Sequence, residues 1–87
     1  MNKKVLIEKI DIILYEDWDP IGIYTTNFLN EYSGYVPTIY KKMISGGDKK
    51  GLSDLLLKFE VSSMGLSGNR DRCDLVASKI LKLKNDR

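Results

Sequence analysis

Few residue types in this 87-residue sequence could carry out chemistry. It contains no histidine and one cysteine, Cys73. A Ser-His-Asp triad, a Cys-His pair and a histidine-ligated metal are therefore excluded. One cysteine also cannot form an internal disulfide or a four-cysteine cluster. Acid–base catalysis would fall to carboxylates, Lys or Tyr, and no pair of these stands at a spacing that favours it. We therefore expect a non-enzymatic protein without a cofactor.

Three carboxylates stand close together at Glu16, Asp17 and Asp19. Carboxylate oxygens are the ligands that calcium and magnesium prefer. The spacing of a calcium-binding loop is missing, because no Asp-x-Asp/Asn-x-Asp/Asn-Gly pattern follows. We interpret these residues as a solvated acidic surface and expect no metal site.

A glycine-rich turn leads into the start of a predicted helix at Asn69, Arg70 and Arg72. Free backbone N–H groups, the helix dipole and two arginines are together typical of an anion-binding site. The sequence is not a Walker phosphate loop, since no Gly-Lys-Ser/Thr follows. Helix capping by Asn69 accounts for the same residues, so capping and anion binding both remain open.

Aromatic side chains are concentrated between residues 18 and 40. Rigid amphipathic rings of this kind are enriched at binding surfaces. The candidate partner-binding residues are Trp18, Tyr24, Phe28, Tyr32 and Tyr35. The alternative is that the rings tie this segment to the protein core, and for Trp18 we favour such a core position, at the end of the helices.

Apolar residues recur at helical spacing in four stretches of the chain. These stretches predict helices at residues 2–15, 34–45, 49–63 and 70–83. Asp48 and Asn69 are predicted N-caps of the last two, and Gly46 is a natural residue to end the second. Pro20 prevents the first helix from continuing, and the segment from residue 18 to 35 has strand propensity in part but no partner strand. We predict that this segment is a long ordered loop.

The fold class that follows is all-α: residues 1–87 form a single domain, a small antiparallel bundle or array of four helices. The formal net charge is +2, with −3 on residues 1–32 and +5 on residues 33–87. Basic and acidic residues are mixed, so we do not expect nucleic-acid binding. No apolar stretch is long enough to span a membrane, and a single cysteine fits a reducing compartment, so we expect a cytoplasmic protein.

Three short motifs in this order are similar to a known group of proteins. They are Trp-Asp-Pro-Ile-Gly at residues 18–22, Asn-Glu-Tyr-Ser-Gly-Tyr-Val-Pro at residues 30–37, and Met-Gly-Leu at residues 64–66. The chain thereby resembles the YugE-like proteins, a family of small bacterial proteins of unknown function. The resemblance implies an all-helical fold and a bacterial cytoplasmic origin, and it transfers no functional residues.

Two hypotheses of function follow from the sequence. The first is a non-enzymatic module that binds another protein, for example as an immunity or regulatory protein, through the aromatic residues named above. The alternative is a domain that binds an anion or a small molecule at the helix start within residues 65–72. The sequence leaves the oligomeric state and the identity of any partner open.

Overall fold

The structure is a computed structural model that describes residues 2–19 and 32–85. Each of two of its α-helices is extended by a π-helical turn, and a third is preceded by a 3₁₀ turn. In chain order the elements are α1 (Lys3–Ile13), the π turn η1 (Leu14–Trp18), the 3₁₀ turn η2 (Ser33–Tyr35), α2 (Val36–Ile44), α3 (Lys49–Lys58), the π turn η3 (Phe59–Ser63) and α4 (Arg70–Asn85).

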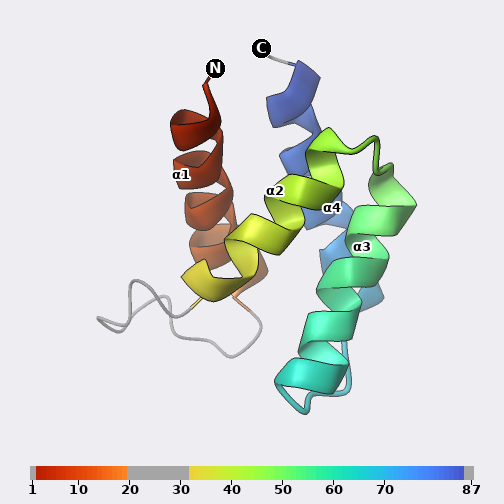
Figure 1. Cartoon of the computed structure of the whole chain (residues 1–87). Coiled ribbons are helices and arrows are strands. Elements are labelled where there is room, and N and C mark those ends of the chain that lie inside the picture. The colour runs from red at the N-terminus through yellow and green to blue at the C-terminus, as the bar shows by residue number, and fades with distance from the viewer. Residues whose placement is uncertain (1, 20–31, 86–87) are drawn as a thin grey trace.

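The helices pack as Figure 1 shows. The start of α1 and the end of α4 lie at the same end of the molecule, so these two helices run in opposite directions, and α3 packs antiparallel to α4. Helix α2 lies across the others and contacts α1, α3 and α4. The described residues form helices and turns and no strand, which confirms the predicted all-α, four-helix fold. Their helices include none that is both long and apolar enough to cross a membrane.

The predicted helix ends are confirmed where a cap was identified. The carboxylate of Asp48 accepts a hydrogen bond from the Gly51 N–H at 2.8 Å. The side chain of Asn69 accepts one from the Arg72 N–H at 3.0 Å. Gly46, with φ of 94°, follows the end of α2. This left-handed conformation favours glycine, so the chain turns there at little cost.

The core is built from the inner faces of all four helices. Its buried hydrophobic residues are Leu6, Ile10, Leu14, Trp18, Tyr32, Val36, Ile39, Met43, Leu52, Leu56, Cys73, Val76, Ala77 and Ile80. Two polar side chains, Ser53 and Glu60, are buried with them. The apolar stripes that predict the helices therefore also identify most of the core, and Glu60 is the exception that needs an explanation.

The π turns extend α1 and α3 along their buried faces. On α1 and η1 the buried residues recur at every fourth position, ending at Trp18, and on α3 and η3 Glu60 follows Leu56 by four. In an α-helix of 3.6 residues per turn, each four-residue step overshoots a full turn by about 40°. A π turn has more residues per turn and corrects this drift. Trp18 and Glu60 therefore return to the core.

The predicted loop between the first two helices is described only at its ends. Trp18 lies inside the π turn that extends α1, and Ser33–Tyr35 forms the 3₁₀ turn before α2. At the first end, Asp19 has a positive φ of 30° and accepts a hydrogen bond from the Tyr32 hydroxyl at 2.7 Å. The two ends are thus joined directly. Residues 20–31 lie outside the described part of the chain.

Candidate functional site

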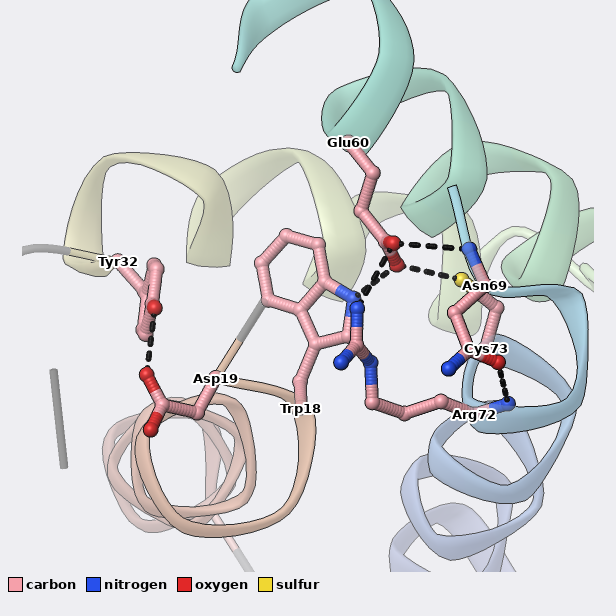
Figure 2. Close-up of polar contacts among 7 residues, drawn as sticks. All are labelled: Trp18, Asp19, Tyr32, Glu60, Asn69, Arg72 and Cys73. Atoms are coloured by element: carbon pink, nitrogen blue, oxygen red, sulfur yellow. Dashed lines mark hydrogen bonds and ion pairs between the residues drawn. The ribbon is translucent and has the colours of Figure 1, made fainter. Parts of the chain in front are cut away.

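The most unusual side chain in the interior is the carboxylate of Glu60, which is 1% exposed. Four donors converge on it, as Figure 2 shows. Oε2 accepts hydrogen bonds from Trp18 Nε1 at 2.8 Å and from Cys73 Sγ at 2.8 Å. Oε1 accepts them from the Asn69 backbone N–H at 3.1 Å and from Arg72 Nη2 at 2.9 Å. We call these five residues the Glu60 cluster.

The cluster satisfies the requirements for burying a carboxylate. An isolated buried charge is very costly, and it is tolerated when it is paired and fully hydrogen-bonded. Arg72 supplies the opposite charge, and the start of α4 supplies a backbone N–H and the positive end of the helix dipole. Glu60 thus joins η3, η1 and α4 in one polar contact inside the core.

Cys73 belongs to this cluster as a hydrogen-bond donor and is not positioned as a nucleophile. Burial is the main cause that raises the pKa of its thiol from 9.0 to about 12, and the hydrogen bond to Glu60 and the charge of that residue raise it further. The thiolate is the reactive form of cysteine. A thiol with this pKa stays protonated at neutral pH, which agrees with the prediction that Cys73 is a buried core residue.

Trp18 fills the core beside Glu60. Its indole is 1% exposed and stands 5.4 Å from the ring of Tyr32 and 5.9 Å from that of Tyr35, centroid to centroid. Phe59 completes the group, with its ring 4.6 Å from that of Tyr35. The core interpretation of Trp18 is therefore confirmed. These four rings pack against one another in an aromatic layer, and Trp18 connects this layer to the Glu60 cluster.

The residues proposed to bind a partner do not form one exposed surface in the described part of the chain. Trp18 and Tyr32 are buried, and Tyr35 is partly buried against the core. Tyr24 and Phe28 lie outside the described residues. A partner would reach neither the Trp18 ring nor the Tyr32 ring without a rearrangement of the core. The sequence signal for these residues was their composition, which cannot distinguish a surface from a core layer.

The residues proposed to bind an anion lie close together, but carboxylates of the chain itself occupy their donors. Arg72 and the Asn69 N–H bind Glu60. Arg70 Nη1 lies 2.7 Å from Asp54 Oδ1, and this hydrogen bond raises the pKa of Arg70 above its ordinary value. A buried glutamate therefore takes up two of the donors that the anion-binding hypothesis requires, and Asn69 caps the helix as the alternative predicted. An external anion would have to compete with these internal partners.

A second polar contact joins α3 to α4 near Arg70. The buried hydroxyl of Ser53 donates to Asp74 Oδ1 at 2.5 Å and accepts a hydrogen bond from Arg70 Nη1 at 3.0 Å. The Arg70–Asp54 pair at its edge is exposed to solvent, so it contributes little to stability. This contact therefore serves to align the two helices.

The predicted acidic surface is present and is used in part for packing. Asp17 Oδ1 lies 3.0 Å from Lys79 Nζ, which links η1 to α4. Glu16 is exposed, whereas Asp19 pairs with Tyr32. Among the residues that the structure describes, no group of three or more Asp, Glu, Cys or His side chains is placed to hold a metal ion.

The surface of the molecule carries a groove between α1 and α2, with a volume of about 360 Å³. Its walls are mainly apolar, and no carboxylate lines it. The lining residues are Lys3, Ile7, Pro37, Tyr40, Lys41 and Ile44. Ile44 is 46% exposed and is one of the exposed large hydrophobic residues among those that the structure describes. We call this feature the α1–α2 groove.

Neither the groove nor the Glu60 cluster was predicted from the sequence. For Glu60 a signal was present, because it continues the buried stripe of Leu52 and Leu56 at a spacing of four. For the groove there was none, since its two walls come from segments whose relative position depends on tertiary packing. Lys3 stands over the ring of Tyr40, 5.6 Å from the centroid, so the walls also contact each other.

Comparison of the chain with protein families, with curated proteins and with solved structures found no match in any of the three. The resemblance to the YugE-like proteins stays a prediction.

Proposed function

We propose that this chain is a small non-enzymatic module that binds another protein, as an immunity or regulatory protein would, and that the α1–α2 groove is its contact surface. The observation that carries the proposal is an apolar surface groove with exposed walls. Ile44 and Pro37 stand exposed beside it. Exposed apolar surface that is concave and rimmed by polar groups is typical of interaction sites.

The Glu60 cluster, the other concentration of polar and ionisable groups, supports a structural role. All four donors of the Glu60 cluster point at one buried carboxylate, and the thiol of Cys73 has a pKa of about 12. A substrate could reach this carboxylate only by displacing those donors. The cluster therefore favours a stability function for Glu60, and it leaves the surface as the place where a partner acts.

We place the protein in the cytoplasm of the cell that makes it. Its single cysteine is free and buried, and it serves as a protonated donor to Glu60. Domains of this size that work in oxidising compartments are commonly stabilised by disulfides. The core and the Glu60 cluster supply that stability here.

Photo-crosslinking in the source cells tests the proposal. A benzoylphenylalanine in place of Ile44 sits on the groove wall, and the same residue in place of Leu75 is the matched control. Leu75 is 59% exposed and lies on α4, outside the groove. We expect a discrete protein adduct from position 44 that is absent from position 75, and that disappears when Lys41→Glu is added.

Two results would contradict the proposal: an adduct at position 75 alone, or adducts at both positions that Lys41→Glu leaves unchanged. The anion alternative predicts a different response. Sulfate would raise the melting temperature of the wild type through binding to the folded state, and Arg70→Ala with Arg72→Ala would remove that rise. We expect no such rise, because Glu60 and Asp54 already occupy the two arginines.

A further inference from the structure

We infer that the α1–α2 groove receives an apolar side chain presented by an acidic segment of the partner protein. This inference rests on the proposed function and adds the chemistry of the partner. It is carried by the charge distribution around the groove. Both walls contribute a lysine, Lys3 from α1 and Lys41 from α2, while the half-buried residues Ile7 and Tyr40 form the floor between them.

Neither of the two lysines is paired with a carboxylate within residues 2–19 and 32–85. Lys3 is instead held over the Tyr40 ring at 5.6 Å, a cation–π contact that keeps its ammonium group at the edge of the groove. Unpaired cations on both sides of an apolar floor are complementary to an apolar side chain flanked by carboxylates.

The dimensions favour a protein segment over a small free ligand. A volume of about 360 Å³ lies at the small end of the range for ligand pockets, which enclose most of the surface of what they bind. This groove is open to the solvent, because Lys3, Pro37, Lys41 and Ile44 in its lining are all exposed. An occupant would therefore keep a side that faces away from the groove. That geometry suits one or two side chains on a larger surface, as in the recognition of amphipathic helices by grooves.

Selection from a displayed library of random peptides tests the inference. Immobilised wild-type protein should enrich peptides in which Leu, Ile, Phe or Met is flanked by Asp or Glu. The affinity of a labelled enriched peptide is then measured by fluorescence anisotropy. Lys3→Glu with Lys41→Glu should weaken it by about tenfold or more, and raising the salt concentration should weaken wild-type binding.

The matched control is Lys50→Glu with Lys58→Glu. Both residues are exposed on α3 outside the groove, and the pair changes the net charge by the same amount. We expect the control to bind within about twofold of the wild type. Enrichment of basic or uncharged peptides would overturn the inference, as would an equal loss of binding in the control.

A membrane surface is the competing target, and vesicles containing phosphatidylserine distinguish it. Cosedimentation that depends on Lys3 and Lys41, without any enriched acidic peptide, would overturn the inference in favour of lipid. Failure of the inference is also separable from failure of the proposed function. A protein adduct at position 44 together with non-acidic peptides contradicts the chemistry of the partner alone, whereas an adduct at position 75 alone contradicts the contact surface.

Discussion

The Glu60 cluster and the α1–α2 groove differ in how their charges are paired: inside the protein in the cluster, and with no carboxylate of the lining in the groove. In the cluster, one buried carboxylate meets four donors, so its charge is fully used inside the protein. In the groove, Lys3 and Lys41 flank apolar walls and have no carboxylate opposite them among the lining residues. Buried ion pairs and hydrogen bonds hold a fold together, whereas exposed charges without an internal ion pair are available to a partner. The comparison therefore assigns stability to the first region and recognition to the second.

Replacing Trp18 should give the largest loss of stability. Trp18→Ala removes a buried indole, its packing against Tyr32 and Tyr35, and a hydrogen bond to Glu60. We expect a loss of about 3–5 kcal/mol in the free energy of unfolding, which approaches the whole stability of so small a domain. Urea unfolding followed by circular dichroism measures it. A loss below about 1 kcal/mol would place the ring at the surface.

Changing Glu60 to its amide should have the next largest effect. Glu60→Gln preserves the shape of the side chain but removes its charge and turns an N–H₂ group toward donors that need an acceptor. We expect a loss of about 1.5–3 kcal/mol, the range for hydrogen bonds to charged groups. Asp54→Asn is the control, because it alters only the exposed pair with Arg70 and should cost clearly less than Glu60→Gln. Equal losses in the two variants would contradict a special role for the Glu60 cluster.

High pH should weaken the cluster through Cys73. The unfolded thiol loses its proton near pH 9, and the folded one keeps it up to a pKa of about 12. The stability associated with the thiol is therefore complete below pH 9 and is lost as the pH rises toward 12. Relative to Cys73→Ser, which does not titrate in this range, the wild type should lose about 2 kcal/mol by about pH 10.5. Parallel pH profiles for the two proteins would show that the thiol is exposed to water.

The smallest effects on stability should come from the groove. Lys41→Glu changes an exposed side chain in the last turn of α2, so it loses only a favourable interaction with the helix dipole. We expect a change below about 1 kcal/mol in urea unfolding, together with loss of the partner adduct at position 44. A large destabilisation would show that the groove belongs to the core, and the comparison between the two regions would then fail.

Local features of this molecule were predictable, and distant contacts were not. The caps at Asp48 and Asn69 were identified because their partners lie three residues away. The partners of Glu60 were not, since one of them, Trp18, is 42 residues distant. The aromatic residues show the same limit, because the contacts that decide their position also come from distant parts of the sequence. Their number indicated contact with something. Only the packing of η1 against α4, the hydrogen bond from Trp18 to Glu60 and the contact between the Tyr32 and Trp18 rings show that these two residues belong to the core.

The spacing of the Glu60 partners along the chain also has a kinetic consequence. Asn69, Arg72 and Cys73 follow Glu60 by 9, 12 and 13 residues, whereas Trp18 precedes it by 42. Closing the longer loop costs about 1 kcal/mol more in chain entropy. We therefore expect α3 and α4 to associate early in folding and α1 to dock late, when the indole N–H reaches the carboxylate. The fluorescence of Trp18, the only tryptophan in the chain, would report that last step in a stopped-flow refolding experiment.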